Sequence, residues 1–125
     1  MSRDFVADIE SYFDVLFAWR IKKIKDIVLS FCNLEGYAIN EEMCCYFSPE
    51  WQEYGLEYFG EGKVLFDFHA PAVDEDRRTI ISYQEFYEIV RRYCTEYANR
   101  HLEEKQEIMH LLERLKKRLD AGGEQ

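Results

Sequence analysis

The sequence predicts an α+β fold, with a small antiparallel sheet of three to four strands flanked by an N-terminal and a C-terminal pair of helices. Apolar residues at helical spacing dominate both ends of the chain, whereas short or alternating apolar runs between turn residues fill the middle. Grouped strands with helices before and after them are typical of this class. A chain of 125 residues, 47% of them apolar, fits a single domain, residues 1–125.

The first forty residues predict two helices, at about 3–17 and 20–35. Two apolar stripes at helical spacing support them. Asp4 and Asp8 lie near the first helix's N-terminus, where the helix dipole favours negative charge, and Gly36 is a stop signal for the second helix. The stripes are Phe5, Ile9, Phe13 and Leu16, then Ile21, Ile24, Val28 and Phe31.

The middle of the chain predicts strands at about 43–47, 56–60, 63–70 and 79–81, with residues 60–62 (GEG) as a hairpin turn. Residues 63–70 (KVLFDFHA) alternate. Val64, Phe66 and Phe68 share one face, and Leu65, Asp67 and His69 share the other. This pattern predicts a half-buried strand, with helices on one face of the sheet and the other face open.

The last third predicts helices at about 83–100 and 103–119, followed by a loose tail, 120–125. Ser82 and Glu85 frame the first helix as a capping box. Phe86, Val90, Tyr93 and Tyr97 mark its buried side, and Ile108, Leu112, Leu115 and Leu119 line one face of the second.

Negative charge is concentrated in the middle of the chain. The net charge is -9, and residues 41–76, with ten acidic residues and the single base Lys63, account for all of it. The residues before this segment sum to -1 and those after it to +1. This balance argues against direct binding to nucleic acid or to an anionic membrane, and it favours a basic partner.

The acidic aromatic segment, residues 49–62 (PEWQEYGLEYFGEG), combines unneutralised carboxylates with large rings. Tyrosine and tryptophan anchor protein interfaces, and surrounding carboxylates speed the encounter with a basic surface. A solvated face that keeps the protein soluble is the simpler alternative. The predicted contact residues are Glu50, Trp51, Glu53, Tyr54, Glu57 and Tyr58, followed by Asp67, His69, Asp74, Glu75 and Asp76.

No catalytic, cofactor or metal motif stands out in the sequence. The glycine-containing stretches lack the spacing of phosphate-binding loops, and the cysteines at 32, 44, 45 and 94 lack the spacing of a zinc site, so we expect reduced and mostly buried thiols. No apolar run is long enough to span a membrane, and the N-terminus lacks a secretory signal. Asp67 and His69 share a strand face and could form a catalytic pair, but no nucleophile is placed beside them.

The layout from about Pro49 to Leu119 resembles the immunity proteins of contact-dependent growth inhibition systems, particularly those that protect against ribonuclease toxins. The likeness lies in the acidic aromatic stretch, then residues 81–101 (ISYQEFYEIVRRYCTEYANRH), then a charged helix at 103–119. The resemblance implies a cytoplasmic protein that is not an enzyme, needs no cofactor, and binds the C-terminal nuclease domain of a cognate toxin in a 1:1 complex.

Three other functions remain open from the sequence. An acidic adaptor or regulatory module would use the same segment on another basic protein. A small enzyme would use Asp67 and His69, and a structural subunit would use the aromatic residues in a homodimer.

Overall fold

The computed structural model describes residues 3–70, 73 and 75–123 and confirms the α+β class. Its helices are α1 (Arg3–Trp19), α2 (Ile24–Cys32), α3 (Tyr83–Arg100) and α4 (Lys105–Gly123). Its strands are β1 (Ala38–Asn40), β2 (Met43–Phe47), β3 (Lys63–Phe68) and β4 (Arg77–Ser82). Three short 3-10 turns are Ile21–Lys23, Ser48–Glu50 and Leu102–Glu104.

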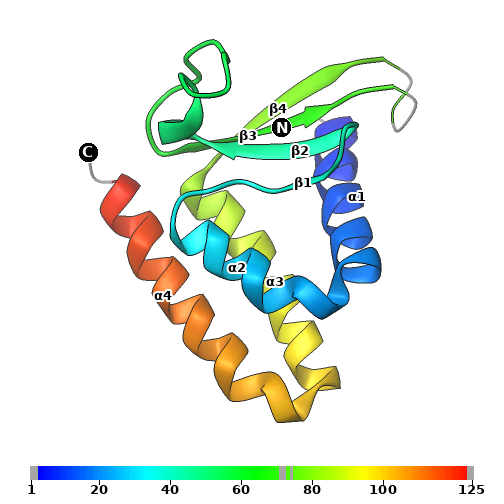
Figure 1. Cartoon of the computed structure of the whole chain (residues 1–125), viewed down its shortest axis with the longest axis vertical. Helices are drawn as coiled ribbons and strands as arrows, with labels where there is room; N and C mark the ends of the chain where they lie inside the picture. Colours follow the sequence, from blue (N-terminus) through cyan, green and yellow to red (C-terminus); the bar gives the residue numbers. More distant parts are fainter. Residues whose placement is uncertain (1–2, 71–72, 74, 124–125) are drawn as a thin grey trace.

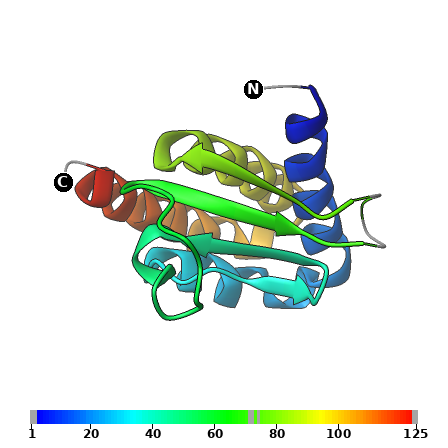
Figure 2. The same cartoon turned by 90° about the horizontal axis from the view of Figure 1, so that it is seen from above.

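The four strands form one antiparallel sheet in the order β1-β2-β3-β4. Helices α2, α3 and α4 lie on one side of it, and α1 stands beside one end (Figures 1 and 2). The opposite side, here called the outer face, carries no α-helix of the described chain (Figure 1). The prediction that helices cover one face of the sheet is therefore confirmed.

Aromatic rings fill the core between the sheet and the helices. Phe66 of β3 lies 5.1 Å from Tyr12 and 6.2 Å from Phe86, measured between ring centroids. Phe13 of α1 contacts both Phe66 and Phe86. Ile21 is 37% exposed, and the Phe5 side chain lies outside the described part of the structure, but the other residues of the predicted apolar stripes converge on one core.

The connection from α2 to the sheet differs from the prediction. The second helix was predicted to span 20–35, but a 3-10 turn precedes α2 and the helix ends at Cys32. Leu34 takes the left-handed conformation, with φ 57°, that closes the helix. Gly36 instead allows the chain to pass close to the backbone of β2, because a Cβ atom at this position would lie 1.9 Å from the carbonyl oxygen of Cys45.

The prediction of a strand at 56–60 is wrong. Those residues have no regular structure, and β3 pairs with β2 instead, with Phe47 opposite Val64. The fourth strand is β1, a short edge strand with an irregular register that the sequence analysis missed. Residues 60–62 still turn the chain, and Gly60 and Gly62 adopt positive φ angles of 100° and 66°.

The end of the chain is more ordered than predicted. The predicted capping box is confirmed, because Ser82 Oγ accepts a bond from the Glu85 N–H and the Glu85 carboxylate accepts one from the Ser82 N–H, both at 3.1 Å. Helix α4 continues to Gly123, so the prediction of a loose tail from residue 120 is wrong for residues 120–123. The last strand extends from 79–81 to Arg77–Ser82.

Candidate toxin-binding surface

The acidic aromatic segment lies on the outer side of the sheet, between the end of β2 and the start of β3 (Figure 1). Tyr54 and Tyr58 are 55% and 58% exposed, which is unusual for rings of this size. Trp51 is half-buried, and its ring lies 5.4 Å from that of Tyr58. The segment therefore presents two large rings to solvent, with a third ring supporting one of them.

The carboxylates of this segment divide into two groups. Glu53, Glu57 and Glu61 are exposed, and no lysine or arginine of the described chain pairs with them. Three unneutralised carboxylates within one short loop make this end of the molecule strongly negative. Such a surface attracts a basic partner and repels an acidic one.

Glu50 has a different position from the one that the sequence analysis gave it. Its side chain is buried, and its Oε1 accepts bonds from the N–H of Phe47 at 2.6 Å and of Gly36 at 3.0 Å. Burial raises the pKa of Glu50, and the two backbone N–H groups partly offset that rise. Glu50 thus anchors the segment to the sheet, and we assign it a supporting role in place of the predicted contact.

The outer face continues from this segment along three neighbouring strands. The register places Tyr46, Leu65 and Ile80 side by side. The Tyr46 ring lies 5.2 Å from the Tyr54 ring, and Ile80 is 46% exposed. Sequence reasoning missed Tyr46 and Ile80 as candidates, although strict alternation along their strands would have placed both on this face.

An ion network occupies the other end of the outer face. Asp67 is buried, and its Oδ1 accepts a bond from Arg78 Nε at 3.3 Å. Its Oδ2 lies 3.0 Å from His69 Nε2, and His69 Nδ1 lies 3.3 Å from Asp76 Oδ2. Asp67 therefore holds the side chains of Arg78 and His69 in position. Arg78, His69 and Asp76 are accessible to a partner.

Two more predicted contact residues lie near this network in the chain. Glu75 is exposed and has no ion-pair partner among the described residues. Asp74 lies outside the residues that the structure describes. Apart from Asp74 and the buried Glu50, the two groups of residues predicted from sequence lie on one side of the molecule, at the two ends of the outer face (Figure 1).

The cysteine paired with Asp67 in the sheet is not an activated nucleophile. Cys44 lies directly opposite Asp67 in the sheet. Burial raises the pKa of the Cys44 thiol, which therefore stays protonated and weakly nucleophilic near neutral pH. All four cysteines are buried and free, which confirms the prediction of buried thiols.

His69 is expected to make stability depend on pH. Bonds to Asp76 and then Asp67 raise its pKa from 6.5, because only the imidazolium donates from both ring nitrogens. The folded protein then binds this proton more tightly than the unfolded chain does. The stabilising contribution is present in full below the unfolded value and is lost as the pH rises through the raised folded value.

Urea unfolding of the wild type and of His69→Gln, from about pH 5.5 to about pH 8.5, checks this prediction. The difference in unfolding free energy between the two proteins should shrink as the pH rises. A difference that is constant across the range would show that the charge of His69 contributes nothing. Asp76→Asn is the complementary variant, because it removes one of the two carboxylates that bond to His69.

Comparison with protein families gives a match over most of the chain. Residues 4–112 match the family model described as CDI immunity protein, where CDI stands for contact-dependent growth inhibition. No curated protein and no solved structure matches the chain. In the part of the chain that the structure describes, no helix has the length and apolar character needed to cross a membrane. The chain belongs to the contact-dependent growth inhibition immunity proteins, which bind and neutralise a cognate toxin.

Proposed function

We propose that this protein neutralises a basic nuclease toxin, a ribonuclease, by binding it in a 1:1 complex in the cytoplasm. The contact surface is the acidic aromatic segment together with the outer face. Family membership implies a toxin-binding, non-enzymatic inhibitor. The observation that carries the finer proposal is the exposure of Tyr54 and Tyr58 beside carboxylates that no base of the described chain neutralises.

A nuclease suits this surface because of what its active site must bind. Nucleases hold phosphates, so their substrate grooves are lined with lysine and arginine. Carboxylates at Glu53 and Glu57 would pair with those groups in place of phosphate, and exposed rings at Tyr54 and Tyr58 would take the place of stacked bases. Such a surface prevents substrate from entering the groove, and the inhibitor needs no chemistry of its own.

The contact area has apolar as well as charged character. Tyr46 and Ile80 lie between the acidic aromatic segment and the ion network, so an apolar centre is bordered by charge at both ends. Tight protein interfaces commonly have this arrangement, with aromatic anchors at the centre and a polar rim. Arg78, the accessible cation of the network, would contact an acidic residue of the toxin.

Co-expression with the product of the gene directly upstream, where we expect the cognate toxin domain, tests the proposal. We expect the protein to restore growth, to co-purify with the toxin at equal stoichiometry, and to stop cleavage of RNA by the purified toxin. Native mass measurement gives the ratio of the two chains. A toxin that is bound but cuts no nucleic acid would contradict the nuclease assignment. Rescue without a stable complex would contradict neutralisation by binding.

A further inference from the structure

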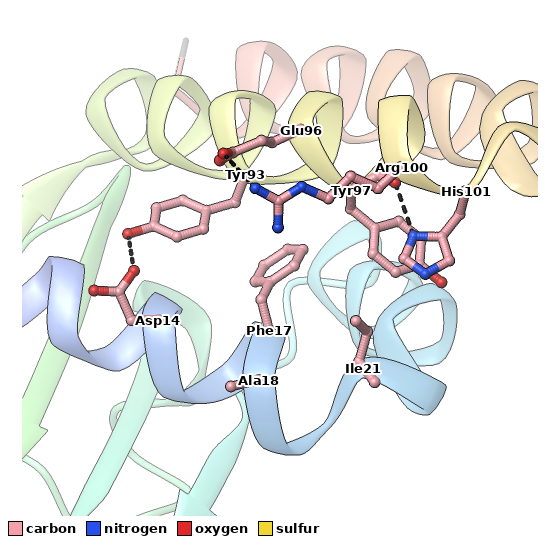
Figure 3. A pocket seen from close by; sticks show the side chains of 9 residues that line it. All are labelled: Asp14, Phe17, Ala18, Ile21, Tyr93, Glu96, Tyr97, Arg100 and His101. Atoms are coloured by element: carbon pink, nitrogen blue, oxygen red, sulfur yellow. Dashed lines mark hydrogen bonds and ion pairs between the residues drawn. The ribbon is translucent and has the colours of Figure 1, made fainter.

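A groove of about 380 Å³ lies between the C-terminal halves of α1 and α3 (Figure 3). It is at the opposite end of the molecule from the acidic aromatic segment (Figures 1 and 2). Phe17 of α1 and Tyr93 and Tyr97 of α3 line it. The Phe17 ring centroid lies 5.4 Å from that of Tyr93 and 6.4 Å from that of Tyr97, so the three rings form a continuous floor.

Hydrogen bonds and stacking hold the walls of this groove in place. Tyr93 donates to Asp14 Oδ1 at 2.7 Å, which fixes that carboxylate at one end of the groove. His101 stacks on Tyr97 at 4.2 Å and closes the other end (Figure 3). The groove is thus a fixed feature of the α1–α3 contact, with a carboxylate already oriented at its edge.

Arg100 of α3 is one of the residues that line the groove. Its guanidinium points toward Glu96, at the edge of the groove (Figure 3). It donates a long hydrogen bond of 3.4 Å to Glu96 Oε1, and its side chain is 75% exposed. A cation held so weakly is easily displaced by another cation that makes better contacts.

Exposed apolar residues line the groove or lie next to lining residues in the chain. Trp19 and Leu102 are each 69% exposed, and each follows a groove residue in the chain, Ala18 and His101. Ile21, which lines the groove, is 37% exposed. Exposed large apolar residues close in the chain to a hollow are a reason to expect an interaction site there.

We propose that this groove is a second docking site, which takes an arginine side chain from a basic segment of another protein partner while the toxin is bound elsewhere. The rings contact the apolar stem, Asp14 and Glu96 pair with the head group, and Trp19 and Leu102 pack on neighbouring apolar residues. A second copy of this chain is disfavoured as the occupant, because each copy carries a net charge of -9.

The test uses a blocked Leu-Arg-Leu peptide and its citrulline counterpart, in which an uncharged urea replaces the guanidinium. Both are titrated into the full-length protein and followed by backbone amide NMR. The arginine peptide should cause saturable shifts in residues 14–21 and 93–101, and the citrulline peptide should bind about tenfold more weakly. Equal binding of the two peptides, no saturation, or shifts centred on residues 49–62 would overturn the proposal.

Variants separate the groove from general attraction to an acidic protein. Asp14→Asn and Glu96→Gln should each weaken peptide binding, because they remove the charge and keep an acceptor. Arg100→Ala should strengthen it by removing the internal competitor. Glu53→Lys with Glu57→Lys should leave it unchanged, and purified toxin should leave the peptide bound. Displacement of the peptide by toxin would overturn the claim of a separate site without touching the toxin-binding proposal.

Discussion

Charge reversal of Glu53 and Glu57 together should weaken toxin binding by about 30- to 1,000-fold, which corresponds to about 2 to 4 kcal/mol. Both side chains are exposed and free of internal ion pairs in the described chain, so the folded structure does not depend on them. Two lysines at these positions would face the basic groove of the toxin and repel it. Affinity is measured by titration calorimetry with the purified toxin domain.

The association and dissociation rates of the toxin complex carry additional information about this surface. Exposed charges act mainly by steering the encounter, so the association rate should fall most at low ionic strength and should converge on the wild-type rate at high salt. Stopped-flow mixing of the two proteins at several salt concentrations checks this. A loss that appears only in the dissociation rate would mean that these carboxylates make buried contacts.

The matched control is Glu103→Lys with Glu113→Lys. Both residues are exposed on the helical side of the molecule, and neither forms an ion pair within the described part of the chain. This variant changes the net charge by the same amount, so it should bind toxin almost as tightly as the wild type does. An equal loss in both variants would assign the effect to net charge, and unchanged affinity in the first variant would remove residues 49–62 from the interface.

The parts of the fold that follow from side-chain period could be predicted from the sequence. The alternation of Val64, Phe66 and Phe68 placed β3 in the sheet, and the S-Y-Q-E pattern placed the start of α3 within a residue. These predictions hold because one buried face, or one capping box, is decided by neighbours in the chain. The acids and rings of residues 49–62 were found from local composition, because four acidic residues and four large aromatic residues stand there without a base.

The parts that depend on distant partners could not be predicted. β1 has three residues and little apolar character of its own, and it forms because β2 offers an edge for pairing. The apolar run at 56–60 forms no strand, because β2 already pairs with β3. The groove has the same origin, since Phe17 lies far from Tyr93 and Tyr97 in the sequence and meets them only in the folded helices.

Glu50 shows how a local pattern can mislead about a single residue. It stands among exposed acids in sequence, yet its carboxylate turns inward and satisfies two backbone N–H groups from Gly36 and Phe47. Phe47 lies only three residues before Glu50, whereas Gly36 belongs to a segment that the sheet brings beside it. A buried donor without a partner is costly, so this carboxylate is the acceptor that allows the chain to leave β2 and enter the acidic aromatic segment.

Replacement of Glu50 by alanine should therefore lower the free energy of unfolding by about 2 to 5 kcal/mol, because two backbone donors lose their acceptor. Glu50→Gln is the informative partner variant. Its amide oxygen can accept both bonds without a buried negative charge, and burial is the cause that raises the pKa of Glu50. We expect Glu50→Gln to be close to the wild type in urea unfolding near neutral pH.

The sign of the pKa shift adds a second check on Glu50. Because the folded carboxyl has a raised pKa, the folded protein takes up this proton more readily than the unfolded chain does. The ionised form therefore costs stability above the folded pKa, and that cost is absent in Glu50→Gln. The stability of Glu50→Gln relative to the wild type should accordingly rise as the pH increases from acid through the folded pKa. If Glu50→Ala were as stable as Glu50→Gln, the two backbone bonds could not be what anchors the acidic aromatic segment.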